Sequence, residues 1–156
     1  MDTIRFGLVK SRLEDYMTTS IYINGIDLRQ IISSIEYEQL LPLNRTSYTG
    51  VYEGISPLLA FSLNDHFCGE TINEYLYYDC QYALFDYMYS GIPGDHTLTC
   101  KIEFKKDNVR WYDFKNFSKI YRGIIDYGDL SFSFDRSAYK AAVYDLKNNQ
   151  LNHMYA

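Results

Sequence analysis

The densest group of side chains that could carry chemistry lies in residues 64–70, which read NDHFCGE. Asp65, His66, Cys68 and Glu70 occur together there beside a glycine. A thiol, an imidazole and a carboxylate are the parts of an activated nucleophile, which works only when a scaffold holds them in contact. No G-x-S-x-G elbow or comparable setting surrounds the cysteine. We therefore interpret the stretch as a surface loop with a half-buried cysteine, and keep catalysis as the alternative.

Zinc binding is the second chemistry that the residue types suggest. Zinc sites usually contain close ligand pairs such as C-x₂-C or H-x₃-H, because paired ligands pre-order the tetrahedron. The candidate ligands here form no such pair; they are His66, Cys68, Cys80, His96 and Cys100. Cys100 also lies on the apolar face of an expected strand, where a cysteine acts as a small hydrophobic residue. We expect no metal ion and no cofactor.

Two further kinds of site find little support. A phosphate site requires a glycine loop that opens onto a helix, whereas SGIPGD at 90–95 contains Pro93 and precedes a strand-like segment. The 20 acidic residues allow many carboxylate pairs of the glycosidase type. Nothing in the sequence singles out one of these pairs.

The most unusual stretch is EYLYYDCQYALFDYMYS at 74–90, which holds six of the 17 tyrosines. We expect a strand at 75–82, with a second strand after it as an option. Strand alternation then places Tyr75, Tyr77 and Asp79 on one face, and Leu76, Tyr78 and Cys80 on the more apolar face. Tyrosine offers a large contact area with few rotatable bonds. The partner-binding surface that we predict consists of Tyr75, Tyr77, Asp79, Asp86, Tyr87 and Tyr89; the alternative is that these rings only cover a sheet.

Length and charge limit the class of protein. A chain of 156 residues suits a single domain at 1–156, and we expect residues 149–156 to be a loose tail. The net charge of −5 argues against nucleic acid or an anionic membrane as the partner, and leaves a basic protein as an option. The N-terminus shows no signal peptide, and three widely spaced cysteines make a poor disulfide framework. The expected location is the cytoplasm.

Periodicity then gives the elements that must position these residues. Leu28, Ile31, Ile32 and Ile35 recur at helical spacing after the cap candidate Asp27, which predicts a helix at 27–38 that ends before Pro42. A second helix is predicted at 136–147 after Asp135. Residues 97–105 alternate as a half-buried strand and pair with 109–114, where Trp111 belongs to the core. Further strands are expected at 3–9, 21–23 and 130–134, and 42–73 reads mostly as loop. The fold class is α+β, an antiparallel sheet of five or six strands with two main helices.

Three motifs resemble those of a family of small uncharacterised bacterial proteins. They are the helix start INGIDL at 23–28, the strand VRW at 109–111 and the helix entry FSFDRSAY at 132–139. The family's clustered cysteines and glycines before the penultimate hairpin are reduced here to Cys80, and its basic pair after the V-x-W strand is reduced to Arg122 nearby. The resemblance implies no activity, and any metal or redox role of that cluster is not expected here.

The combined features favour a protein that acts by binding another protein. The most concrete version is an immunity-type or antitoxin-like inhibitor of a bacterial toxin or effector, because the chain is small, acidic and rich in tyrosine. The alternative is a small-ligand binder or enzyme with a tyrosine-lined pocket near residues 64–70. A concave cavity that converges on His66 would favour the alternative, and a flat acidic tyrosine face would favour the inhibitor.

Overall fold

The computed structural model describes residues 1–11, 17–55, 63–69, 76–88, 95–118 and 121–155. It confirms the predicted class, since the chain is α+β with two antiparallel sheets. The larger sheet has the order β4-β6-β7-β8-β9, with β5 paired to β6. Its strands are β4 Tyr52–Gly54, β5 Tyr77–Tyr78, β6 Gln81–Tyr87, β7 His96–Phe104, β8 Asn108–Ser118 and β9 Phe132–Asp135. The smaller sheet contains β1 Ile4–Lys10, β2 Met17–Ile23 and β3 Ile26–Asp27.

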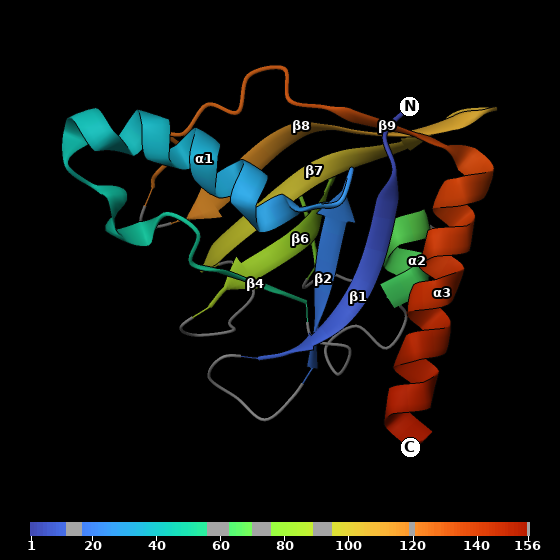
Figure 1. Cartoon of the computed structure of the whole chain (residues 1–156). Coiled ribbons are helices and arrows are strands. Elements are labelled where there is room, and N and C mark those ends of the chain that lie inside the picture. The colour runs from blue at the N-terminus through green and yellow to red at the C-terminus, as the bar shows by residue number, and fades with distance from the viewer. Residues whose placement is uncertain (12–16, 56–62, 70–75, 89–94, 119–120, 156) are drawn as a thin grey trace.

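The helices lie on different sides of these sheets. In Figure 1, α3 stands beside β1 and α2, whereas α1 passes in front of β7 and β8 in this view and contacts β2 and β3. None of the described helices has the length and apolar character needed to cross a membrane. The helices are α1 Leu28–Leu40, α2 Leu63–Cys68 and α3 Arg136–Tyr155, with 3₁₀ turns at Leu41–Leu43 and Thr46–Tyr48.

The start of α1 forms as its local sequence predicts. Asn24 and Gly25 both have positive φ angles, 53° and 79°, as a tight turn between β2 and β3 requires. The Asp27 carboxylate then accepts a hydrogen bond of 2.9 Å from the Arg29 backbone N–H, which caps the helix. The α-helix ends before Pro42, which lies within the 3₁₀ turn Leu41–Leu43.

The last helix begins as predicted and ends later. The Asp135 carboxylate accepts a hydrogen bond of 2.9 Å from the Ala138 N–H, which confirms the cap. The expected end at Asn148–Asn149, followed by a loose tail, is wrong because α3 continues through Tyr155. Asparagine has a low helix propensity but does not break a helix, and no glycine or proline follows the two asparagines to end it.

The tyrosine-rich stretch is a hairpin, so the single strand expected at 75–82 is wrong. β5 pairs with β6 through Tyr77 opposite Tyr82, and Asp79 and Cys80 form the turn between them. Both turn residues have positive φ angles, 49° and 65°, which suits the twist of a two-residue hairpin. Alternation therefore cannot continue through residue 80.

The two sheets meet where β2 passes β4. The Thr19 backbone N–H and its hydroxyl both donate to the Ile55 carbonyl, at 3.1 and 3.0 Å. A Cβ on Gly54 would lie 1.6 Å from the Thr19 carbonyl oxygen, so this close approach requires glycine.

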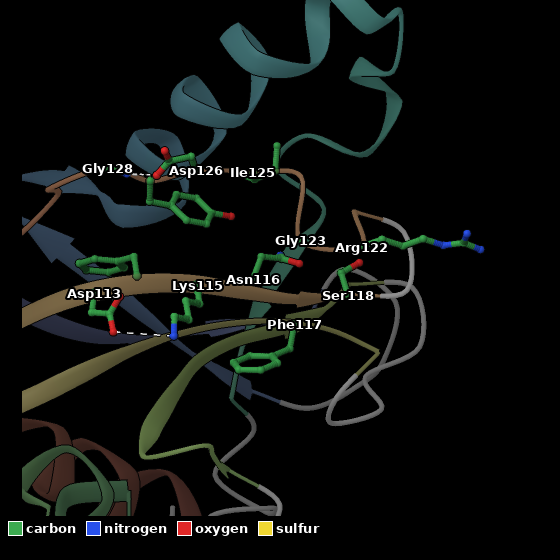
Figure 2. A pocket seen from close by; sticks show the side chains of 12 residues that line it. Asp113, Lys115, Asn116, Phe117, Ser118, Arg122, Gly123, Ile125, Asp126 and Gly128 are labelled. Atoms are coloured by element: carbon green, nitrogen blue, oxygen red, sulfur yellow. Dashed lines mark hydrogen bonds and ion pairs between the residues drawn. The ribbon is translucent and has the colours of Figure 1, made fainter.

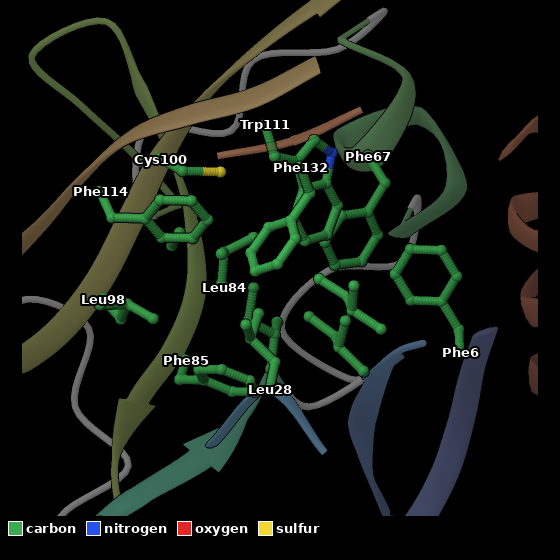
Figure 3. Packing of buried hydrophobic residues seen from close by; sticks show 14 of the residues in the cluster. Phe6, Leu28, Phe67, Leu84, Phe85, Leu98, Cys100, Trp111, Phe114 and Phe132 are labelled. Atoms are coloured by element: carbon green, nitrogen blue, oxygen red, sulfur yellow. The ribbon is translucent and has the colours of Figure 1, made fainter. Parts of the chain in front are cut away.

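Trp111 lies at the centre of the core, as predicted. Its indole N–H donates to the Tyr139 hydroxyl at 3.1 Å, and that hydroxyl donates to the Phe67 carbonyl at 2.7 Å. Figure 3 shows Phe6, Phe67 and Trp111 packed together, and the Phe6 and Phe67 ring centroids are 4.8 Å apart. One polar chain therefore joins β8, α3 and α2 inside an apolar cluster.

Candidate functional site

The feature that stands out in the interior is a buried carboxylate, that of Glu36. It lies on α1 one turn after Ile32 and one turn before Leu40, so three successive turns of the helix place a side chain in the interior. Its exposed fraction is 0%. A buried carboxylate is costly unless it is hydrogen-bonded or paired with a cation.

Three tyrosine hydroxyls satisfy this carboxylate. The Tyr52 and Tyr127 hydroxyls donate to Oε2 at 2.5 and 2.7 Å, and the Tyr121 hydroxyl donates to Oε1 at 2.8 Å. Asn116 extends the network, because its Nδ2 donates to the Tyr52 hydroxyl at 2.5 Å. We call Glu36, Tyr52, Asn116, Tyr121 and Tyr127 the carboxylate cluster.

Burial dominates the electrostatics of the carboxylate cluster. Desolvation raises the pKa of Glu36 above its ordinary value, and the three tyrosine hydrogen bonds act in the opposite direction. Desolvation likewise raises the pKa values of Tyr52, Tyr121 and Tyr127, with the charge of Glu36 adding to it. Within the described residues, Glu36 accepts from tyrosines and forms no ion pair with a basic side chain. Within the described residues, hydroxyl groups alone therefore satisfy the buried carboxyl group.

His96 packs against this cluster from β7. Its ring stacks on Tyr52 with centroids 4.7 Å apart and meets Tyr121 edge-on at 4.7 Å. Its Nδ1 lies 2.8 Å from the Ser118 Oγ. Burial lowers the pKa of His96 to about 4, so the ring is neutral at pH 7. Nε2 is buried and has no hydrogen-bond partner among the described residues.

A pocket of about 600 Å³ opens beside the carboxylate cluster. Figure 2 shows Asn116 and Ser118 directed from β8 toward the segment 122–128, with the Arg122 side chain directed outward. The wall includes Phe114, Asn116 and Ser118 from β8, and Gly123, Ile125 and Tyr127 from the facing segment. The volume is in the range of small-molecule sites.

One wall group has an unmet hydrogen-bonding capacity. The Asn116 Oδ1 is buried and has no partner within the described residues. Unpaired buried acceptors are uncommon because each one loses its hydration without compensation. Asn116 therefore carries one unsatisfied acceptor, which lies inside the protein behind the pocket surface.

The segment that closes the pocket is fixed to α1. The Gln39 Nε2 donates to the Asp126 carbonyl at 2.5 Å, and the Asp126 N–H donates to the Gln39 Oε1 at 2.8 Å. Together with the tyrosine bonds to Glu36, these contacts hold residues 121–127 against the helix.

The predicted partner-binding residues are scattered over the hairpin. Asp79 is exposed at the turn, and Tyr77 is half-buried, with its ring 5.0 Å from that of Tyr82. The expected exposure of Asp86 is wrong: its exposed fraction is 4%, and it accepts a hydrogen bond of 2.8 Å from the Thr97 hydroxyl. Tyr87 is half-buried and lies 5.6 Å from the His96 ring, beside the carboxylate cluster. Tyr75 and Tyr89 lie outside the described residues.

Residues 63–68 form the helix α2, so the surface loop expected at 64–70 is wrong in this part. His66 is 2% exposed, and its Nε2 lies 2.8 Å from the Ala83 carbonyl. Burial lowers the pKa of His66. Cys68 is half-buried as expected, and Glu70 lies outside the described residues. His66 contributes to packing, and the pocket of the carboxylate cluster lies near His96 instead.

The other candidate metal ligands are separated. Cys80 is exposed at the hairpin turn, whereas Cys100 is buried in β7, where desolvation raises the pKa of its thiol. In the described parts of the chain, no three His, Cys, Asp or Glu side chains are grouped as a metal site requires.

The sequence contained one signal for the carboxylate cluster. Glu36 is four residues after Ile32 and eight after Leu28, so it belongs to the apolar stripe of the predicted helix. Its three tyrosine partners are 16, 85 and 91 residues away, and no local pattern links them.

Comparison with known proteins gives no match to a family model, to a curated protein or to a solved structure. The resemblance to a bacterial family therefore stays an expectation.

Proposed function

We propose that this protein acts by binding, and that its principal site is the pocket between β8 and residues 122–128. The observation that supports the proposal most is the pocket of about 600 Å³ itself, whose wall is held in place by the hydrogen bonds of Tyr52, Asn116 and Tyr127 in the carboxylate cluster. A concave site with a few fixed polar groups is typical of ligand-binding proteins. This proposal keeps the ligand pocket of the sequence-based alternative but moves it from His66 to β8, where Tyr127 is the one tyrosine among the described lining residues.

The chemistry of the cluster favours binding over catalysis. The Glu36 oxygens already accept three hydroxyl groups, and the carboxylate is sealed from solvent, so it is poorly placed to take a proton from a substrate. Neutral His96 contacts Ser118, but its ring is fully buried behind the pocket wall. Covalent catalysis requires a nucleophile and a base that both contact the bound substrate. The sealed Glu36 and the buried His96 do not meet this requirement.

The proposal is tested by a fragment screen with two-dimensional amide NMR of the ¹⁵N-labelled protein. We expect the amide shifts to concentrate at Asn116, Ser118, Gly123 and Gly128. Ile125→Trp, which fills the pocket, should abolish these shifts.

The matched control fills a different hollow. Ala141→Trp alters the groove between β1 and α3, which is lined by Phe6, Gly7 and Ala141 among others. It should leave the shifts unchanged. Fragment shifts that concentrate on this groove, or that survive Ile125→Trp, would refute the proposal.

Binding to another protein is the second candidate function, and an exposed apolar surface favours it. Leu41 and Leu43 are each 55% exposed at the end of α1, and Ile124 is 43% exposed on the segment that Gln39 holds against that helix. Clustered exposed apolar side chains are typical of interaction sites. The immunity-type or antitoxin-like inhibitor remains the most concrete version, with a cytoplasmic location.

The product of the neighbouring gene is the partner to test, because inhibitors are commonly encoded beside their targets. Under this second candidate, Leu43→Asp should weaken that complex at least tenfold if the apolar surface is used. Tyr77→Ala should do so if the β5–β6 hairpin is used. Wild-type affinity in both variants would exclude both surfaces.

A further inference from the structure

We infer that a second pocket, between α2 and α3, binds a phosphate group carried on an apolar or aromatic body. The two helices stand side by side in Figure 1, and the pocket between them has a volume of about 330 Å³. Its lining comes from the end of α2, from β6 and β7, and from the first two turns of α3. We call it the α2–α3 pocket. It shares no described lining residue with the pocket beside the carboxylate cluster, so the inference does not depend on the proposed function.

The charged side chains that line the α2–α3 pocket are both positive. Arg136 and Lys140 are four residues apart on α3, so they project from the same face of the helix. Arg136 is half-buried, with its guanidinium 5.6 Å from the centre of the Phe104 ring, and its Nη1 donates to the Lys105 carbonyl at 2.8 Å. Within the described residues neither base forms an ion pair, and no acidic side chain is part of the described lining.

This placement of two bases opposes the electrostatics of α3 itself. The N-terminal end of a helix carries a partial positive charge, so a cation in the first turns is unfavourable there. Like charges at i and i+4 also repel each other. The first turn of α3 contains no acid that would offset Arg136 and Lys140. A local rule that is broken without compensation from the chain is expected at a functional site.

The charged residues beside the lining do not cancel the positive charge. Asp135 precedes Arg136 and is engaged as the helix cap, and the Asp107 carbonyl accepts from the Arg136 backbone N–H at 3.0 Å. Lys105 is bonded to Arg136 through its carbonyl. With Lys140, three bases therefore face two acids, which is a local net charge of +1 in a chain whose net charge is −5.

The floor of the α2–α3 pocket is apolar. Ile102 and Phe104 lie on the face of β7 that packs against the core, and both are half-buried. Lys101 and Glu103 alternate with them and therefore project from the opposite face of the strand. The floor thus offers contact area to the apolar part of a ligand without adding a charge.

Tyr82 adds a neutral hydrogen-bond donor to the lining. Burial raises the pKa of Tyr82, so its hydroxyl keeps its proton at pH 7. Gly69 lies beside it with a φ angle of 68°, and a Cβ at this position would be 3.2 Å from the Tyr82 hydroxyl oxygen. The glycine therefore leaves the hydroxyl uncovered on this side.

This set of donors matches phosphate better than a carboxylate. A phosphate monoester carries a charge of about −1.5 to −2 at pH 7 and three strong acceptor oxygens. The guanidinium of Arg136 and the ammonium of Lys140 together supply two positive charges and several N–H donors, and Tyr82 supplies an O–H. A carboxylate neutralises only one of the two charges.

The test compares probes of similar shape on the wild-type protein by amide NMR titration. The probes are phenyl phosphate, benzoate, benzyl alcohol and benzylamine. We expect phenyl phosphate to shift Gly69, Phe104 and Lys140 with at least about tenfold higher affinity than benzyl alcohol, benzoate to lie between them, and benzylamine to bind least. Ile125→Trp should leave these shifts unchanged, which separates this site from the pocket of the proposed function.

A second titration distinguishes the two sources of such a phosphate. The probe is the peptide Gly-Gly-Tyr-Gly-Gly with a phosphorylated tyrosine. Tighter binding of this peptide than of phenyl phosphate assigns the site to a phosphorylated protein, and the reverse assigns it to a small molecule.

Charge-matched variants on one helix identify the source of the preference. Lys140→Gln should weaken phenyl phosphate at least about fivefold, whereas Lys147→Gln, which removes the same charge seven residues further along α3 and outside the described lining, should weaken it less than about twofold. In thermal melts without ligand, Lys140→Gln should be at least as stable as the wild type, because it removes an unfavourable charge near the start of the helix. Phenyl phosphate should then raise the melting temperature of the wild type more than that of Lys140→Gln.

Three outcomes would overturn the inference. The first is binding of benzyl alcohol or benzylamine at this pocket as tight as that of phenyl phosphate. The second is an absence of shifts at Gly69, Phe104 and Lys140 with every probe. The third is an equal loss of affinity in Lys140→Gln and Lys147→Gln, because it would show that phosphate senses only the general charge of the helix.

Discussion

The pH dependence of folding should report directly on buried His96. Its pKa is lowered by burial from the ordinary 6.5 to about 4, so the unfolded chain takes up the proton first as the pH falls. The contribution of His96 to stability is therefore complete above pH 6.5 and is lost between pH 6.5 and about 4. For such a pKa difference, the free energy of unfolding should fall by roughly 3 kcal/mol between pH 7 and 4.

Two other groups act in the same range and require a variant comparison. Burial also lowers the pKa of His66, so its contribution has the same sign. The raised pKa of Glu36 has the opposite effect, because stability increases as the pH falls toward its ordinary 4.5. The difference between wild type and His96→Phe cancels both contributions, and phenylalanine keeps a ring in the stack on Tyr52.

The assay is urea unfolding of both proteins from pH 7 to 4. Relative to His96→Phe, the wild type should lose roughly 3 kcal/mol more over this range, whereas His66→Phe should retain the His96 part of the slope. An NMR titration of the imidazole Cε1–H of His96 measures the pKa itself. A constant difference between wild type and His96→Phe, or a midpoint above pH 6, would show that the ring is not held neutral by burial.

Three further predictions concern individual side chains. Glu36→Ala leaves three buried tyrosine hydroxyls without their acceptor and should lower the free energy of unfolding by about 3–5 kcal/mol in urea, whereas exposed Glu38→Ala should change it by less than about 0.5 kcal/mol; equal effects would contradict the burial of the carboxylate. Gly54→Ala forces a backbone clash and should cost at least about 3 kcal/mol in the same assay. A Cβ on Gly7 would meet side-chain atoms alone, the nearest being Ser20 Oγ at 2.8 Å, so Gly7→Ala should cost less, and equal losses would contradict the close approach of β2 and β4. Tyr77→Ala should lower the melting temperature by the equivalent of about 1 kcal/mol or less, and a larger loss would place that ring in the core.

The elements with strong local signals could be predicted from the sequence. The helix after Asp27 has a capping residue, an Asn-Gly turn before it and a proline after it, all within 20 residues. The 97–105 and 109–114 pair has clear alternation in the sequence, and β7 and β8 confirm the pairing. The expected half-burial of 97–105 is wrong in its first part, because both faces of β7 are buried from His96 to Cys100. In each case the residues that determine the helix or strand lie within it or directly beside it in the sequence.

The hairpin at residues 77–87 had weaker signals. Its turn residues, Asp79 and Cys80, adopt positive φ angles without a glycine, so no turn dipeptide marked the reversal. Asp86 then lies on a face that β7 covers through Thr97. An acidic residue among tyrosines is expected to be exposed, but here the hydroxyl of Thr97, 11 residues further along the chain, donates a hydrogen bond to buried Asp86.

The candidate site depended on contacts that no short pattern records. Tyr52 lies in the short strand β4, whereas Tyr121 and Tyr127 lie in a segment without helix or strand, and only the folded chain brings their hydroxyls to Glu36. The high tyrosine content did carry information. It predicted half-exposed rings, while several of the rings are buried because each hydroxyl has an acceptor.

The carboxylate cluster links the stability of the fold to the shape of the pocket. Glu36 joins α1 to β4 through Tyr52 and to the segment 121–127 through Tyr121 and Tyr127, and that segment forms one wall of the pocket. An apolar residue at position 36 would continue the helix stripe without the desolvation cost of a charge, but it would leave the three hydroxyls unsatisfied. The carboxylate also orients Asn116, because the Tyr52 hydroxyl that donates to Glu36 accepts from the Asn116 Nδ2. A ligand in the pocket contacts a wall that already joins three distant parts of the chain, so it should stabilise the folded protein once its concentration exceeds its dissociation constant.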